Sequence, residues 1–178
     1  MNQQNPDVTQ RMRIVTWEDP MPAAKIAPSM SGLAYFQAML AGKLPKPPIA
    51  SLMNFNLTEA GEGRIVFSVV PAEYHYNPIG VVHGGLAATL LDSCMGCAVQ
   101  SALPAGVGYT TIELKVNYIR PLTVNSGLVH AIGEVIHRGR RVATAEGKLV
   151  DENGKLYAHG TTTCMVFTPS SAHNQDQR

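Results

Sequence analysis

The chain has 178 residues, of which 45% are hydrophobic and 15% charged, so it can bury one core without a disulfide or metal. Fourteen Lys and Arg against thirteen Asp and Glu leave a net charge of +1, which argues against a nucleic-acid-binding surface. The odd count of three cysteines does not favour an extracellular disulfide framework. Because the N-terminus lacks an apolar signal segment and no uninterrupted apolar stretch could span a membrane, we expect a cytoplasmic protein.

The first part of the chain predicts one helix and one hairpin. Residues 1–28 are rich in Pro, Met and polar side chains without a period, so we expect a flexible extension. Apolar residues at spacings of three and four predict a helix over residues 29–40. Successive prolines in residues 43–48 should then end any helix. Residues 51–58 and 64–70 are predicted to form two strands around a Gly-Glu-Gly turn.

The second part predicts one long helix and then strands alone. After an irregular loop over residues 71–82, an apolar stripe predicts a helix from His83 to about Ala102. A period of two then predicts a half-buried strand with one side made of Thr110, Ile112, Leu114, Val116 and Tyr118. Further strands are predicted over residues 128–138, 141–151 and 156–167. Asn153-Gly154 should join the last two as a type I′ turn, and residues 170–178 form a polar, mobile tail.

This order of elements favours an α+β fold, in which an antiparallel sheet of about six strands wraps around the single long helix. We expect one domain over residues 29–169, with the first helix as an addition to it. A doubly wound nucleotide-binding fold would need alternating strands and helices, and neither this alternation nor a phosphate-binding glycine loop is found in the sequence.

Residues 77–92, NPIGVVHGGLAATLLD, contain the groups best suited to chemistry. Gly84 and Gly85 open the long helix, so their N–H groups lie at the positive end of its macrodipole and could bind an oxyanion of the substrate. Neither has a Cβ, so a carbonyl group can approach the backbone closely. Asp92 lies on the same side of the helix among small residues, where a carboxylate needs either a hydrogen-bonding partner or a function.

The spacing from Gly84 to Asp92 indicates that a site using both needs two chains. Eight residues at 1.5 Å each separate them by roughly 12 Å along the helix axis. If two copies pack their long helices antiparallel about a two-fold axis, Gly84 of one copy comes opposite Asp92 of the other. We therefore expect a homodimer with two identical sites.

The pattern N-x-x-G-x-x-H-G-G followed by an acid resembles the hotdog-fold thioesterases, in particular the branch named after the phenylacetate-degradation thioesterase. In this sequence the pattern comprises Asn77, Gly80, His83, Gly84, Gly85 and Asp92. The resemblance covers residues 51–167, including the predicted strands YTTIELKVNYIRP and HGTTTCMVF. It implies the hotdog fold, hydrolysis of acyl-CoA thioesters, and a dimer that pairs further into a tetramer.

The resemblance also implies a role for each matching residue. Asp92 would activate water or attack the thioester carbonyl itself, while the Gly84 amide and the Asn77 side chain of the other subunit hold that carbonyl. His83 would start the helix and order the loop, and Thr111 would assist the water. No metal and no cofactor besides the CoA of the substrate is implied. Cations for the CoA phosphates are expected among Arg120, Arg138, Arg140 and Arg141.

Several alternatives stay open. Asp92 could bridge structure alone, and Asn77 could be a turn residue ahead of Pro78. The C-x-x-C motif of residues 94–97 lies about three turns inside the helix, where no helix N-terminus stabilises a thiolate, so it favours small core residues over redox or zinc chemistry. A non-catalytic acyl-CoA binder and a hotdog hydratase or dehydratase are the rival functions. CoA and a carrier-protein arm are both open as the leaving thiol.

Overall fold

The computed structural model describes residues 9–168; the first eight residues of the predicted extension and the predicted tail, residues 170–178, lie outside this range. The helices are α1 (Met21–Ile26), α2 (Gly32–Leu40), α3 (Pro48–Met53) and α4 (Gly84–Ser101). The strands are β1 (Phe55–Gly61), β2 (Arg64–Val69), β3 (Gly108–Tyr118), β4 (Val129–Arg138), β5 (Val142–Asp151) and β6 (Leu156–Phe167). A short 3₁₀ helix, η2 (Glu73–His75), lies in the loop before α4. None of the helices within residues 9–168 is long and apolar enough to cross a membrane.

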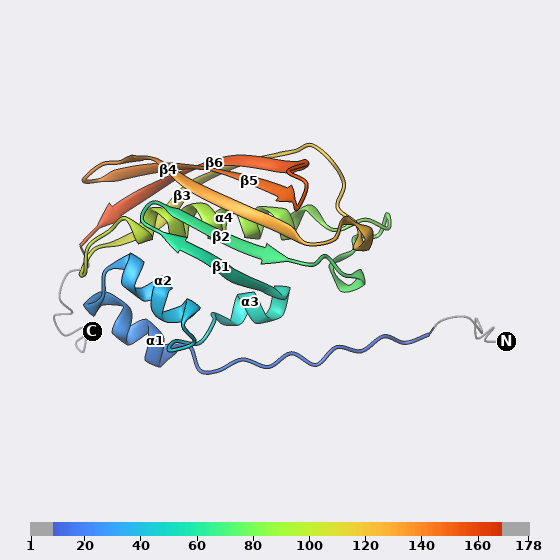
Figure 1. Ribbon diagram of the computed structural model, residues 1–178, viewed down its shortest axis with the longest axis horizontal. Helices are drawn as coiled ribbons and strands as arrows, with labels where there is room; N and C mark the ends of the chain where they lie inside the picture. The colour runs from blue at the N-terminus through green and yellow to red at the C-terminus, as the bar shows by residue number, and fades with distance from the viewer. Residues whose placement is uncertain (1–8, 169–178) are drawn as a thin grey trace, which may run out of the picture.

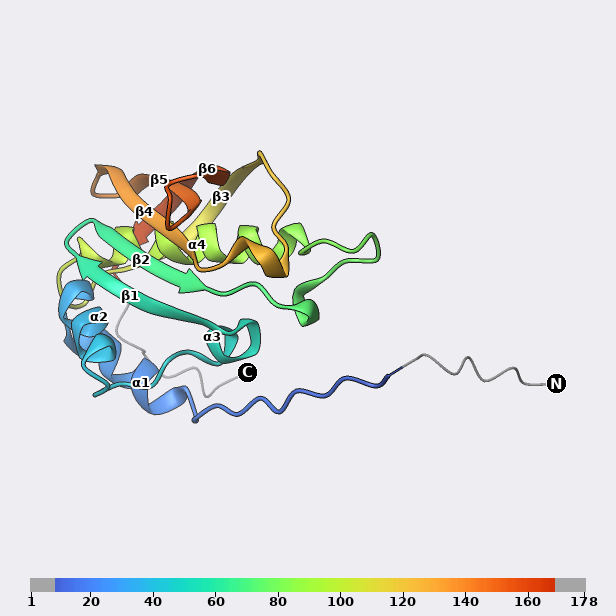
Figure 2. The same cartoon turned by 45° about the vertical axis from the view of Figure 1, so that its right-hand side comes forward.

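The six strands form one antiparallel sheet in the order β1-β2-β4-β5-β6-β3. The sheet curves around α4, which runs along its concave side (Figures 1 and 2). Helix α2 packs against both β1 and α4, and α1 and α3 lie near it at the bottom of Figure 1. The predicted α+β arrangement of one sheet around one long helix, with an added N-terminal helix, is confirmed.

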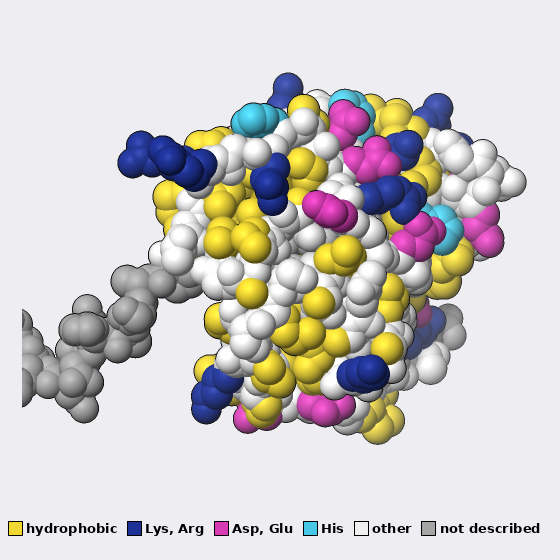
Figure 3. Space-filling view, turned by 60° about the vertical axis from the view of Figure 1, so that its left-hand side comes forward, with side chains coloured by type: hydrophobic (Ala, Val, Ile, Leu, Met, Phe, Trp, Pro, Cys, Tyr) yellow, Lys and Arg dark blue, Asp and Glu magenta, His cyan; other side chains and the backbone are white. Residues whose placement is uncertain are grey.

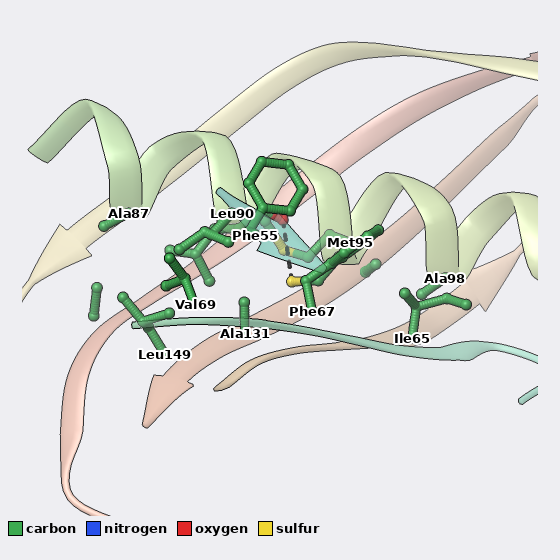
Figure 4. Packing of buried hydrophobic residues seen from close by; sticks show 14 of the residues in the cluster. Phe55, Ile65, Phe67, Val69, Ala87, Leu90, Met95, Ala98, Ala131 and Leu149 are labelled. Carbon is green, nitrogen blue, oxygen red and sulfur yellow. Dashed lines mark hydrogen bonds between the residues drawn. The ribbon is translucent and has the colours of Figure 1, made fainter. Parts of the chain in front are cut away.

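Helix α4 meets the sheet through the apolar stripe predicted from the sequence. Its residues there are at most 2% exposed: Leu86, Leu90, Leu91, Cys94 and Ala98. They pack against side chains of β2, β4 and β5, which include Ile65, Phe67, Val69, Ala131 and Leu149 (Figure 4). Gly133 on β4 permits this close approach, because an added Cβ would lie 2.3 Å from the carbonyl oxygen of Cys94. The core therefore fixes the height and rotation of α4 over the sheet.

The N-terminal third differs from the prediction in two segments. Residues 21–26, which we placed in the extension, form α1. Residues 51–53, predicted to begin a strand, are instead the end of α3, so that prediction was wrong. Pro48 is the first residue of α3, a position where a fixed φ favours the helix and the missing N–H costs nothing. Asn54 then ends the helix with a left-handed φ of 56°, and β1 begins.

A β-bulge in β3 breaks the predicted alternation. Thr111 and Glu113 pair with consecutive residues of β6, which leaves Ile112 as the extra residue. Tyr109 and Thr111 therefore face α4, while Ile112, predicted to lie on the buried side, is 59% exposed. The prediction of one continuous apolar side was wrong for the part of β3 before the bulge.

The β5–β6 connection has the predicted bounds but not the predicted turn type. The carboxylate of Asp151 accepts the N–H groups of Asn153 and Lys155 at 2.9 and 3.0 Å, which closes a loop of residues 152–155. A type I′ turn needs positive φ at both central residues, but only Gly154 has one in this loop, at 76°. The predicted two-residue turn at Asn153-Gly154 was wrong.

Candidate active site

His83 is the N-cap residue of α4. Its ring Nδ1 accepts the N–H of Gly85 at 2.8 Å, and its backbone carbonyl accepts the N–H of Leu86 at 3.0 Å. The cap therefore occupies one of the two glycine N–H groups proposed from the sequence as oxyanion donors. Within residues 9–168, no hydrogen bond engages the N–H of Gly84. Gly84 is thus the residue of this pair that has a free donor at the positive end of the helix.

Tyr118, at the end of β3, lies over Gly84. Its hydroxyl donates to the Gly84 carbonyl oxygen at 3.3 Å, and an added Cβ at Gly84 would lie 3.1 Å from the ring. A larger residue at position 84 would push this ring aside. Both residues line a cavity of about 300 Å³ at the N-terminal end of α4. Arg120 lines the same cavity, and one of its guanidinium N–H groups is bound to the Leu156 carbonyl.

Asn77 organises the loop that leads into α4. Its side-chain oxygen accepts the N–H groups of Ile79 and Val81 at 3.1 and 3.2 Å, and its own N–H donates to the Val81 carbonyl at 2.8 Å. This is the turn role that the sequence left open. Both side-chain bonds use Oδ1, and the Nδ2 amide makes no hydrogen bond with other groups of residues 9–168. The turn therefore orients Asn77 and leaves its N–H groups as donors.

Asp92 lies half-buried in the middle of α4, bonded to β3. The hydroxyl of Thr111 donates to Asp92 Oδ1 at 3.0 Å. This bond depends on the bulge at Ile112, which turns Thr111 toward the helix. In the described part of the chain, Oδ2 of Asp92 has no hydrogen-bond partner and no Lys or Arg pairs with the carboxylate. One oxygen is oriented by a hydroxyl while the other is free to accept a proton.

Tyr109, which the sequence analysis did not single out, crosses α4 one turn beyond Asp92. Its hydroxyl oxygen lies 2.6 Å from where a Cβ of Gly96 would be, so only glycine fits there. The hydroxyl lies beside the Cys97 thiol, and burial raises the pKa of Tyr109 well above its usual range. Burial likewise raises the pKa of Cys97 to about 12, so both groups are protonated at neutral pH. A glycine one turn after the acid was the sequence signal for a side chain crossing the helix here.

The remaining cysteines support the core interpretation of the C-x-x-C motif. Cys94 and Cys164 are fully buried, and all three cysteines are free thiols. Burial raises the pKa of Cys94, which disfavours the reactive thiolate.

The four arginines predicted to hold CoA phosphates lie at opposite ends of α4. Arg120 lies in the cavity beside Gly84, whereas Arg138 donates to the carbonyl of Ala102, just past the other end of the helix. Arg140 lines a second cavity there with Arg138, and Arg141 follows in the same β4–β5 connection. A helix of 18 residues separates the two groups by roughly 27 Å.

The sequence-predicted residues thus form two separate groups in one chain. His83, Gly84 and Arg120 lie at the N-terminus of α4, Asn77 lies in the loop that leads into it, and Asp92 and Thr111 lie together two turns along the helix. The roughly 12 Å rise between Gly84 and Asp92 keeps the free N–H of Gly84 away from the carboxylate of Asp92 in the same chain.

Comparisons with known proteins match this chain to one family. Residues 79–158 match the model of the thioesterase superfamily. The "Putative esterase VNG_1336C" of Halobacterium salinarum is 36% identical over 107 residues, which cover 57% of this chain and 69% of that protein. Acyl-coenzyme A thioesterase 13 of Homo sapiens is 28% identical over 113 residues, which cover 63% and 79%. The solved structure of a phenylacetic acid degradation-related protein from Ralstonia eutropha JMP134 has 31% identity and a TM-score of 0.66, covering 74% of this chain and 98% of that one.

Proposed function

Because the chain belongs to the thioesterase superfamily, with the hotdog fold, and is a thioester hydrolase, we propose that it hydrolyses acyl-CoA at a site shared by two subunits. The observation that carries this proposal is the environment of the Asp92 carboxylate. Asp92 is a half-buried carboxylate without a cationic partner in the described chain, held by Thr111 through one oxygen and open at the other.

In the proposed reaction Asp92 acts as a general base. Its free oxygen takes a proton from water, and the water oxygen bonds to the thioester carbonyl carbon. The Gly84 N–H and the Asn77 amide of the other subunit stabilise the oxyanion that forms. When the C–S bond breaks, the thiolate takes the proton from Asp92, which leaves a free acid and CoA. A general base typically contributes about 10²- to 10⁴-fold, and one oxyanion donor about 3 to 4 kcal/mol. Direct attack by Asp92 is the alternative first step.

Two features support a second copy of the chain at this site. The small and half-buried residues Ala88 and Thr89 flank Asp92 on α4, so another helix can come close. β3 is an edge strand of the sheet, and its residues Leu114 and Tyr118, on the side that faces α4, are 36% and 58% exposed. A homodimer would cover these apolar side chains and bring Gly84 of one subunit to Asp92 of the other. Further pairing into a tetramer stays a prediction.

Arg120 supports CoA as the leaving group. It lines the cavity of about 300 Å³ that Gly84 also lines, at the N-terminal end of α4. Arginine binds phosphate oxygens through two parallel N–H groups, and within residues 9–168 only one N–H group of Arg120 has a hydrogen-bond partner. A related human protein is named an acyl-coenzyme A thioesterase, which agrees with this substrate class.

The test mixes two variants that are each inactive for a different reason. Asp92→Asn keeps an oxygen for the Thr111 hydroxyl but loses the base. Asn77→Asp keeps Oδ1 for the N–H groups of Ile79 and Val81 but loses the amide donors. Each variant alone should release thiol from acyl-CoA at least about 10²-fold more slowly than the wild type.

Mixed dimers of the two variants should recover activity. With random pairing, half of the dimers are mixed and each has one intact site, so about a quarter of wild-type activity is expected. Mixed dimers that stay inactive would contradict the shared site, and an Asp92→Asn variant with full activity would contradict the base. Tight binding of acyl-CoA without thiol release by the wild type would instead favour the non-catalytic binder, and release of a hydrated acyl-CoA would favour the hydratase.

A further inference from the structure

We propose that Tyr109 closes the acyl end of the site and separates Asp92 from an apolar cavity beneath α2, so that this enzyme selects compact acyl groups. The inference rests on the proposed hydrolysis at Asp92 and assigns its specificity. Tyr109 lies outside the thioesterase pattern of residues 77–92.

The position of Tyr109 follows from the bulge in β3. Thr111 and Tyr109 both face α4, and they lie against consecutive turns of the helix, at Asp92 and Gly96. Where a side chain at position 96 would begin, the tyrosine hydroxyl and ring lie instead, 2.6 and 2.9 Å from an ideal Cβ. An acyl group that extends from Asp92 toward the C-terminal end of α4 therefore meets this ring after about one helical turn, or roughly 5 to 6 Å.

Tyr109 is held in place rather than free to swing aside. Its ring packs against the hydrophobic core, and its hydroxyl lies beside the Cys97 thiol. Tyr35, on α2, packs against the same hydrophobic core. Tyr109 and Cys97 thus form a wall across α4 one turn beyond Asp92.

An apolar cavity of about 250 Å³ lies beyond this wall. It is lined by Tyr35 and Phe36 of α2, by Gln100 of α4, by Val107, and by Ala27 and Pro28 at the turn between α1 and α2. Gln100 is two turns past Asp92, or roughly 12 Å along the axis. Apolar side chains also gather on the outer surface at this end of the molecule (Figure 3). The turn at Ala27 lies outside the residues that match the family model.

The wall makes a quantitative prediction about chain length. Each methylene group that moves from water into an apolar cavity improves kcat/KM about fourfold. With Tyr109 in place, methylenes beyond the wall gain nothing and must displace packed side chains. Without the ring, three additional methylenes in the cavity would improve kcat/KM by about 60-fold.

The experiment measures kcat/KM for thiol release from straight-chain acyl-CoA substrates, from butyryl to dodecanoyl. The wild type should prefer the short substrates. Tyr109→Ala should raise the ratio of decanoyl to butyryl activity by about 50-fold or more, while Tyr109→Phe, which keeps the ring, should leave the profile unchanged. Ala27→Trp added to Tyr109→Ala should refill the cavity and reverse most of the gain. Tyr74→Ala, at an exposed tyrosine of η2, is the matched control and should keep the wild-type profile.

A folded Tyr109→Ala enzyme with the wild-type profile would overturn the inference, as would a wild type that already prefers dodecanoyl-CoA. If Tyr109→Ala does not fold, Tyr109→Leu offers a smaller opening and should shift the preferred length in the same direction; an unchanged profile there would overturn the inference equally. Failure of the proposed function has a different signature, namely no thiol release by the wild type from any acyl-CoA, or full activity of Asp92→Asn.

Discussion

Thr111→Val isolates the hydrogen bond that orients the proposed base. Valine keeps the volume and the branched Cβ of threonine but cannot donate to Asp92 Oδ1, which now accepts the Thr111 hydroxyl at 3.0 Å. A hydrogen bond to a charged group contributes about 1.5 to 3 kcal/mol. If the whole free energy of this hydrogen bond stabilises the transition state, kcat should fall by about 10- to 150-fold when the bond is removed. KM should change little, because the hydroxyl is proposed to act on the base and the water.

The chain supplies a matched control at the neighbouring position. Thr110 precedes Thr111 on β3 but faces away from α4 and is exposed, so Thr110→Val should keep kcat within about twofold of the wild type. Thr111→Ser retains a hydroxyl and should restore most of the activity. The assay is thiol release at saturating acyl-CoA, with thermal melting to establish that each variant is folded. Equal losses in Thr110→Val and Thr111→Val, or wild-type kcat in Thr111→Val, would refute the role given to this bond.

Three further perturbations test other parts of the structure. Arg120→Ala should raise KM for acyl-CoA by about tenfold with little change in kcat. With an acyl-pantetheine substrate, which lacks the nucleotide phosphates, the wild type and Arg120→Ala should have the same KM. Gly133→Ala places a Cβ 2.3 Å from the Cys94 carbonyl oxygen and should lower the free energy of unfolding by about 3 kcal/mol or more. Gly147→Ala should lower it less, because the added Cβ meets the movable side chains of Met95 and Leu91 at 2.9 and 3.1 Å. Urea denaturation compares the two variants, and equal losses would contradict the rigid contact at Gly133. Burial lowers the pKa of His75 below its ordinary value of 6.5, so the unfolded chain binds the proton more readily and the free energy of unfolding should fall as the pH drops below about 6.5. His75→Gln should flatten this slope in urea titrations between about pH 7.5 and pH 5, and an unchanged slope would assign it to other groups.

The elements that the sequence predicted well are those with a strong local pattern. The long helix was expected from His83 to about Ala102 and runs from Gly84 to Ser101, because its apolar stripe and glycine start are visible in one stretch of chain. The last three strands agree with the predicted bounds to within a residue for the same reason. Pro48 was ambiguous, since proline both ends a helix and favours the first position of the next one, and packing against β1 decides between these outcomes.

Within the candidate site, the residue types were predictable from the sequence, but which of their polar groups are free to bind a substrate was not. Gly84 and Gly85 are equivalent in the sequence as N–H donors, and only the ring of His83 distinguishes them by capping Gly85. The Asn77 side chain was open as either a turn former or a substrate ligand, and its geometry permits both because the turn uses the oxygen alone. Such distinctions depend on the rotation of side chains, which periodicity and spacing do not encode.

The bulge at Ile112 connects the fold to the proposed chemistry. Leu114 and Tyr118 face the side of the sheet that carries α4, and in a regular strand every second residue before them would face it too. That phase would turn Thr111 and Tyr109 to the opposite surface, away from the helix. One extra residue reverses the phase, so the same strand presents apolar side chains at one end, the partner of Asp92 in its middle and the wall of the acyl site at the other end. Because the bulge depends on pairing with β6, a segment more than forty residues later in the chain, the proposed base and the proposed specificity residue are positioned by a contact that no local pattern in the sequence reveals.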